Sequence, residues 1–240
     1  PAPIVDFILK HSNHDKKSPE ELLKKSKRIL FLGDSITQSG TFIVHFEAWL
    51  VKRYPDLRFT VINAGLSSET VSGLSEENHA GGRFPRPCLF ERLERVLAKT
   101  NPDLIIACYG MNCGIYKELD EERTRQFRNG ILRLRAVAQQ YGAEVVHVTP
   151  PIYDNHGKVR LKYDSVLTTY AEWLVEQREQ GWHVADLHSE MRAKVDQNRK
   201  QDPGYTVQKD RVHPNDEGHW MMAQCLIAYF GDPASAQAAS

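Results

Sequence analysis

The stretch Arg28-Ile29-Leu30-Phe31-Leu32-Gly33-Asp34-Ser35 decides the fold class of this 240-residue chain. Its short apolar run ends abruptly in a small polar turn, which is typical of a buried strand that stops at one edge of a sheet. Four further apolar runs of similar length follow, at residues 59–62, 104–108, 145–148 and 182–185. The sequence therefore predicts five buried strands.

Segments with the apolar spacing of amphipathic helices alternate with these runs. They cover residues 42–54, 89–99, 121–141, 165–180 and 217–230. Strands that alternate with helices pair in parallel, because each right-handed crossover returns the chain to the same edge of the sheet. We expect an α/β three-layer sandwich in which a five-stranded parallel sheet carries helices on both faces.

A chain of this length is ordinary for one α/β domain. We expect residues 1–27 to form an N-terminal extension, residues 28–232 a single domain and residues 233–240 a loose C-terminal tail. Two long stretches, 66–87 and 197–210, do not fit this alternation, and the first of them is rich in Gly, Pro and Ser. They predict loops, and long loops in compact domains usually carry function.

The balance of charges bears on the partners. The 31 Lys and Arg residues equal the 31 Asp and Glu residues, so no net field attracts nucleic acid or an anionic membrane. No apolar run approaches the roughly 20 residues that span a bilayer. We expect a neutral or mixed substrate, no nucleic acid and no membrane span, and the sequence gives no indication of the oligomeric state.

The chain opens with Pro1-Ala2-Pro3 rather than Met, which favours removal of an upstream segment. A secreted or periplasmic protein is expected if that segment was a signal peptide, and a cytoplasmic one otherwise. The four cysteines have neither the spacing of a metal site nor the density of a disulfide framework.

Two segments supply the side chains that acyl transfer requires. Ser35 offers a hydroxyl nucleophile after the first predicted strand, and Asp210-Arg211-Val212-His213 offers a carboxylate and an imidazole. A serine gains nucleophilic power when an imidazole accepts its proton, and a carboxylate orients that imidazole. Asp186 and His188, after the last predicted strand, are an alternative pair, although Asp186 is also suited to cap a following helix.

Two more segments follow strands in the same way, namely Asn63-Ala64-Gly65 and Gly110-Met111-Asn112-Cys113. Ligands in open α/β sheets bind beyond the carboxyl ends of the strands, so these residues are expected to meet Ser35 at one edge. With the segments of Ser35 and His213, and in this order, they resemble the four signature blocks of the SGNH (GDSL-type) hydrolases, a family of serine esterases and acyl hydrolases. The resemblance spans about residues 28–230.

The resemblance implies a flavodoxin-like sheet and carboxylic ester hydrolysis through an acyl-enzyme. It implies Ser35, Asp210 and His213 as the catalytic residues. It also implies an oxyanion hole formed by the N–H groups of Ser35 and Gly65 and the side-chain amide of Asn112. The chain departs from the family pattern at Cys113, where Asp is usual, and we expect this to weaken a local hydrogen-bond network rather than catalysis.

Other kinds of site fit the sequence less well. Residues 33–40 lack the Lys and the glycine spacing of a phosphate loop, and no Gly-x-Gly-x-x-Gly or Gly-x-Ser-x-Gly motif is present. His213 and His219 have no partners at metal-binding spacing, so neither a metal nor a cofactor is expected. A Cys113 nucleophile and a non-catalytic binding module on the same fold are the remaining alternatives.

The substrate prediction rests on the loop after Gly65, in which polar and charged side chains surround isolated apolar ones. Such a loop is a poor lining for a fatty acyl chain, whose binding gains about 0.8 kcal/mol per buried CH₂. We expect a small-molecule or carbohydrate ester, and above all removal of acetyl groups from a carbohydrate, with His79, Arg83 and Arg86 as candidate substrate contacts. Since the resembled family includes lysophospholipases and thioesterases, an acyl hydrolase of that type is the alternative.

Overall fold

The computed structural model describes residues 17–156 and 162–231. Within them a single five-stranded sheet has the strand order β2-β1-β3-β4-β5, and every neighbouring pair is parallel. The strands are β1 (Arg28–Gly33), β2 (Thr60–Asn63), β3 (Leu104–Cys108), β4 (Glu144–Val148) and β5 (His183–Ala185). The predicted flavodoxin-like parallel sheet is confirmed.

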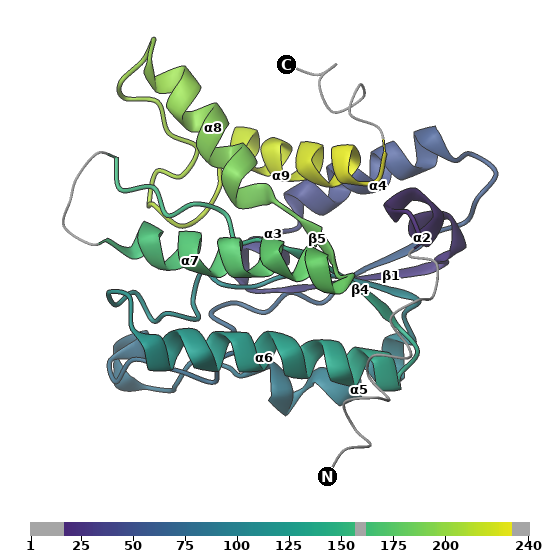
Figure 1. Ribbon diagram of the computed structural model, residues 1–240, viewed down its shortest axis with the longest axis horizontal. Helices are drawn as coiled ribbons and strands as arrows, with labels where there is room; N and C mark the ends of the chain where they lie inside the picture. The colour runs from purple at the N-terminus through teal and green to yellow at the C-terminus, as the bar shows by residue number, and fades with distance from the viewer. Residues whose placement is uncertain (1–16, 157–161, 232–240) are drawn as a thin grey trace.

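The helices that connect the strands cover both faces of the sheet. In Figure 1, α5 and α6 lie below the sheet, and α4 and α9 lie above it. The longer helices are α4 (Thr41–Arg53), α5 (Leu93–Thr100), α6 (Glu121–Gln140), α7 (Tyr163–Glu176), α8 (Leu187–Arg199) and α9 (Asp216–Tyr229). The three-layer α/β sandwich is therefore confirmed as well.

Besides the short helix α3 (Ser35–Ser39), two described helices fall outside the segments that the apolar spacing predicted. The helix α2 (Pro19–Lys25) begins with a capping box at Ser18 and buries Leu22 and Leu23 in the core. It lies inside the expected N-terminal extension, yet it packs as part of the globular fold. The helix α8 follows β5 directly and is capped by Asp186. The expected tail at 233–240 lies outside the described residues.

The register of the sheet aligns the strand ends. Gly33 pairs with Cys108, Cys108 with Val148, and Val148 with Ala185, so four strands stop at one level. A Cβ on Gly33 would lie 2.8 Å from the carbonyl oxygen of Cys108, so only glycine allows β1 to approach β3 this closely. The loops that follow these strands are thereby gathered at a single edge.

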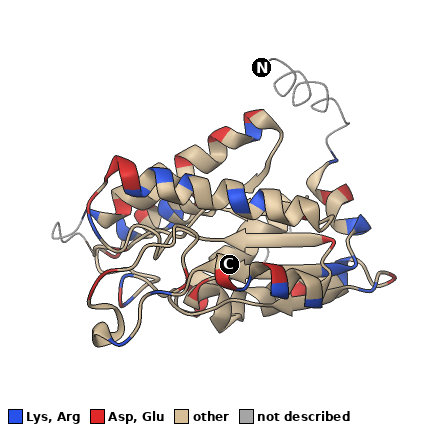
Figure 2. Ribbon diagram, turned by 90° about the horizontal axis from the view of Figure 1, so that it is seen from below, with Lys and Arg blue, Asp and Glu red and all other residues tan. Residues whose placement is uncertain are grey.

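The surface carries charges of both signs. Figure 2 shows Lys and Arg side by side with Asp and Glu along the helices, in keeping with a formal net charge of zero. Among the described residues, no helix combines the length and the apolar character needed to cross a membrane.

Candidate active site

Ser35 is placed by the turn that ends β1. Asp34 accepts a hydrogen bond from the Ile36 N–H at 3.0 Å and so caps the short helix α3 (Ser35–Ser39), which makes Ser35 the first helical residue. The first N–H groups of a helix have no partner inside the helix. The turn therefore presents both the hydroxyl and the N–H of Ser35 at the edge of the sheet.

The imidazole of His213 joins Ser35 to Asp210. Ser35 Oγ lies 2.8 Å from His213 Nε2, and His213 Nδ1 lies 2.6 Å from Asp210 Oδ2. An ionised carboxylate only accepts, so Nδ1 carries the proton and Nε2 is the acceptor for the serine hydroxyl. The three side chains thus come together from the start of α3 and from one loop, with Ser35 and His213 separated by 178 residues in the chain.

Asp210 is held in the charged form that this arrangement needs. Burial raises the pKa of its carboxyl, but hydrogen bonds from the His213 ring, the His213 N–H and the Val212 N–H outweigh it and lower the pKa below its ordinary value. The side chains of His213 and Asp210 are 51% and 56% exposed. The pair therefore lies open to solvent and to a large substrate.

Asp34, the residue before Ser35, has a structural role. It is buried, and this raises the pKa of its carboxyl to about 6, although the Ile36 N–H opposes the shift. Its Oδ1 accepts the hydrogen bond from that backbone group, whereas the Ser35 hydroxyl is bonded to His213. The cap fixes the start of α3 and with it the position of Ser35.

Asn112 lies in the loop after β3 and is oriented from both ends of its amide. Its Oδ1 accepts a hydrogen bond from the Tyr116 hydroxyl at 3.0 Å, and its Nδ2 lies 3.4 Å from the carbonyl oxygen of Glu69. Tyr116 was not a candidate in the sequence. Its only signal is an aromatic residue four positions after the Asn, and its left-handed backbone with φ of 55° is not readable from the chain.

Gly65 has a packing role that the sequence did not reveal. A Cβ there would lie 2.3 Å from the Gln38 nitrogen, so the loop after β2 approaches α3 as closely as only glycine permits. Its N–H donates to Asn63 Oδ1 at 2.9 Å. As an oxyanion donor, Gly65 would first have to leave this partner.

Ser68 offers another N–H on the same loop. It has φ of 65°, in the left-handed region, and its N–H has no hydrogen-bond partner among the described residues. The next residue, Glu69, supplies the carbonyl that faces Asn112. The carboxylate of Glu69 is fully buried and is bonded by Arg92 and by the Tyr109 hydroxyl, which fixes this part of the loop.

The three candidate substrate contacts are engaged within the protein. Arg86 makes two hydrogen bonds to Glu76, at 2.7 and 2.6 Å, and its guanidinium lies 5.3 Å from the centre of the Tyr116 ring. His79 bonds the carbonyl of Phe84 at 3.0 Å. Arg83 donates to the carbonyl of Ala80, three residues earlier in the same loop. Arg86 therefore supports Tyr116, and through it Asn112.

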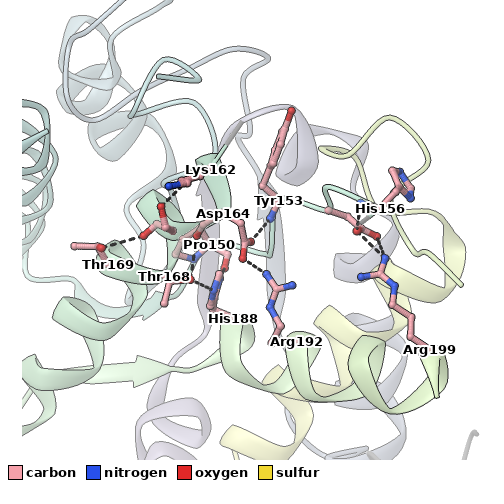
Figure 3. A network of polar contacts seen from close by, with 12 residues as sticks. Pro150, Tyr153, His156, Lys162, Asp164, Thr168, Thr169, His188, Arg192 and Arg199 are labelled. Atoms are coloured by element: carbon pink, nitrogen blue, oxygen red, sulfur yellow. Dashed lines mark hydrogen bonds and ion pairs between the residues drawn. The ribbon is translucent and has the colours of Figure 1, made fainter. Parts of the chain in front are cut away.

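Two alternatives from the sequence find no support in the geometry. Burial raises the pKa of the Cys113 thiol to about 12, so the side chain stays protonated and lacks the reactivity of a thiolate. His188 is buried, with its ring nitrogens 3.0 Å from Thr168 Oγ1 and 3.2 Å from the carbonyl oxygen of Pro150 (Figure 3). Asp186 instead caps α8 through the Ser189 N–H.

A metal centre is not assembled in the part of the chain that the structure describes. In residues 17–156 and 162–231 no three His, Cys, Asp or Glu side chains are grouped so as to hold a metal ion. The chemistry that the described geometry offers is that of a hydroxyl, an imidazole and a carboxylate joined in line.

Solved structures resemble the chain in fold. It is similar to Axe2, an acetylxylan esterase from Geobacillus stearothermophilus, with 19% identity and a TM-score of 0.67 over 85% of this chain and 94% of that chain. It is also similar to a gut microbial diltiazem-metabolizing enzyme, with 22% identity and a TM-score of 0.69 over 87% of this chain. The match covers 47% of that enzyme, so the chain spans about half its length.

Sequence comparison goes further than the fold. No curated protein matches the chain. The model of the GDSL-like Lipase/Acylhydrolase family does match, over residues 31–221, which is about four-fifths of the chain and includes the loops of Ser35, Asn112 and His213. The chain belongs to the GDSL-like lipase/acylhydrolase family, the SGNH hydrolases, and is a carboxylic ester hydrolase.

Proposed function

We propose that the protein removes short acyl groups, above all acetyl, from a carbohydrate through an acyl-enzyme on Ser35. The observation that carries the mechanism is the continuous line from Ser35 Oγ to His213 Nε2 and from His213 Nδ1 to Asp210 Oδ2, at 2.8 and 2.6 Å. Distances of this size allow the proton to pass as the hydroxyl attacks.

In the first half-reaction, Ser35 Oγ attacks the ester carbonyl while His213 Nε2 accepts the hydroxyl proton. The C–O bond of the ester then breaks, and His213 returns the proton to the departing sugar hydroxyl. Water repeats the sequence on the acyl-enzyme and releases the acid and free Ser35. Asp210 stabilises the imidazolium in both halves.

The negative charge that develops on the carbonyl oxygen needs donors that are fixed before the reaction begins. We assign this role to the Ser35 N–H and to Asn112 Nδ2, with a third donor from the loop after β2. The Gly65 N–H is the family-based choice, but it is bonded to Asn63, whereas the Ser68 N–H is unpartnered within the described residues. Both backbone groups belong to the loop after β2, so either one places the third donor on that loop.

Two observations support a carbohydrate ester over a fatty one. His213 and Asp210 are more than half exposed, which admits a bulky leaving group, and the loop at 66–87 offers mainly polar groups, with Phe84 as an isolated exposed apolar side chain. The fold is also similar to that of an acetylxylan esterase.

The test is acetate release from acetylated xylooligosaccharides, measured beside a series of p-nitrophenyl esters from acetyl to octanoyl. The proposal expects acetate release and a preference for acetyl, and Ser35→Ala should abolish both. If the rate instead rises steadily toward octanoyl and no acetate leaves the sugar, a lysophospholipase or thioesterase activity replaces the carbohydrate proposal.

A further inference from the structure

The loop at residues 200–215 carries both Asp210 and His213, yet it contains no helix or strand. The two side chains are exposed, so packing around them does little to fix their position. Their placement depends on the backbone of the loop. Inside it, Val207 and Gln208 are fully buried, and their carbonyls accept hydrogen bonds from the Asn215 N–H at the end of the loop and from the Arg211 N–H within it.

Asp154, in the segment that follows β4, reaches this loop with its side chain. Its side chain is 1% exposed, and its two oxygens accept hydrogen bonds from Arg199 at 2.7 Å each and from the Thr206 hydroxyl at 2.6 Å. Its own N–H donates to the carbonyl of Arg211 at 3.0 Å. Figure 3 shows Arg199 extending from the end of α8 toward this segment, beside His156.

Thr206 continues the connection toward the imidazole. Its hydroxyl oxygen accepts a hydrogen bond from the Gln208 N–H at 3.0 Å, and Gln208 Nε2 donates to the carbonyl of Val212 at 2.9 Å. That carbonyl belongs to the peptide bond that leads into His213. A continuous series of hydrogen bonds thus runs from Asp154 through Thr206 and Gln208 to the backbone of the base.

A buried carboxylate is tolerated only when it is paired and hydrogen-bonded. Burial raises the pKa of the Asp154 carboxyl, but the bonds from Arg199, Thr206 and the His156 N–H outweigh it, so the pKa lies below its ordinary value. Asp154 is therefore a fixed negative charge at neutral pH. It gives the Thr206 hydroxyl one strong acceptor and hence one orientation.

We propose that Asp154 and Thr206 are positioning residues that set the location of His213 relative to Ser35. The inference rests on the proposed function, because it assigns to the two residues the geometry of that reaction. Neither side chain touches Ser35 or the ring of His213. They act through Gln208 and the Val212 peptide.

Thr206→Val tests the proposal, because valine keeps the shape of threonine and removes only the hydroxyl. We expect kcat for p-nitrophenyl acetate to fall about ten- to a hundredfold while KM changes less than about twofold, since small misplacements of a catalytic group cost up to about that much. Thr206→Ser restores the hydroxyl and should return kcat to within about threefold of the unmodified protein. Thr206→Ala serves in place of Thr206→Val should the latter fail to fold.

The matched control is Asp164→Asn. Asp164 also pairs with an arginine of α8, Arg192, and accepts the Tyr153 N–H (Figure 3). No hydrogen bond or ion pair joins its side chain to residues 200–215 within the described chain. Its loss should lower the melting temperature without lowering kcat. Rates are expressed per active site, counted by titration with a fluorophosphonate, so unfolded protein does not enter kcat.

The outcomes separate this proposal from the one it rests on. If Ser35→Ala keeps full activity, the proposed function itself fails. If activity depends on Ser35 while Thr206→Val and Thr206→Ala keep the kcat of the unmodified protein, the positioning role is overturned. The positioning role is also overturned if the melting temperature falls equally in Thr206→Val and Thr206→Ser while kcat is unchanged in both.

Discussion

The phenolic oxygen of Tyr116 lies 3.0 Å from Asn112 Oδ1 and donates a hydrogen bond to it. Because an amide has distinct donor and acceptor ends, this bond holds Oδ1 toward Tyr116 and leaves Nδ2 facing the carbonyl of Glu69. Tyr116 is itself supported by the Arg86 guanidinium over its ring and by the Tyr163 ring, 4.9 Å away. The orientation of a neutral donor is thus set by a residue outside the catalytic line.

Tyr116→Phe should therefore lower kcat about tenfold while leaving KM for a small ester nearly unchanged. The substitution removes one hydrogen bond to a buried amide, and such a bond contributes on the order of 1 kcal/mol. Steady-state kinetics with p-nitrophenyl acetate measure the effect, and Tyr141→Phe, on an exposed side chain, is the control. An unchanged kcat would show that Asn112 keeps its orientation without Tyr116.

Asn112→Ala should have the larger effect, because it removes the donor and not only its support. Loss of one oxyanion donor typically costs about a hundredfold or more in turnover. The melting temperature should change little beside this loss of rate. A variant that unfolds at 25 °C, or one that retains most of its kcat, would contradict the role of Asn112 as a donor.

Ser35 should become acylated, and His213 should matter as much as Ser35. Residues of one catalytic unit show similar losses when they are removed singly. An organophosphonate probe with peptide mapping should locate the adduct on Ser35, and His213→Ala should lower activity about as far as Ser35→Ala. His188→Ala is the comparison, since His188 bonds Thr168 and Pro150 instead. An adduct on Cys113, or greater damage from His188→Ala, would refute the assignment.

Gly65→Ala should destabilise the fold. The new methyl group would lie 2.3 Å from the backbone nitrogen of Gln38, which is not a flexible side-chain end, so the loop and α3 must separate. Overpacking of this kind typically costs about 1–3 kcal/mol, which urea unfolding can measure. The control is Ala64→Ser, at the position before Gly65. Gly73→Ala does not serve as a control, because the positive φ of Gly73 would strain any other residue. Equal stability of Gly65→Ala and the unmodified protein would remove the packing argument.

His147 should make the fold sensitive to acid. It is 1% exposed and stacked on Trp182, and burial, with Arg135 in the same direction, lowers the pKa of its imidazole to about 3. The unfolded chain, with an ordinary value near 6.5, therefore binds the proton first, so the stability is complete above about pH 6.5 and is lost as the pH falls toward 3. At pH 5 the loss amounts to about 2 kcal/mol.

His147→Leu should flatten this dependence, because the apolar side chain has no proton to bind. The measurement is the free energy of unfolding at pH 7.5 and at pH 5 for both proteins. Asp34, whose pKa is raised to about 6, acts in the opposite direction, but it is present in both and cancels in the difference. The same change between the two pH values in both proteins would contradict the role of His147.

The sequence by itself determined the elements that depend on local pattern. The run from Arg28 to Leu32 and its four counterparts predicted the strands, because a buried parallel strand needs only a short continuous apolar run. Asp210 and His213 were recognised together because they lie in one turn. The carboxylate of Asp210 bonds both the N–H and the ring of His213, three residues later in the chain. The family followed from four such blocks in order.

Only the tertiary structure decided which distant groups meet. His188 follows an apolar run and His213 follows a polar loop, and each has an aspartate close by in the chain, but strand register and the course of the loop at 200–215 bring only His213 to Ser35. Arg86 reads as an exposed cation in a polar loop, yet Glu76 and Tyr116 surround it once the loop folds back. Such contacts join residues through packing across the sheet edge. They depend on the relative placement of whole elements, which the spacing of residues along the chain does not encode.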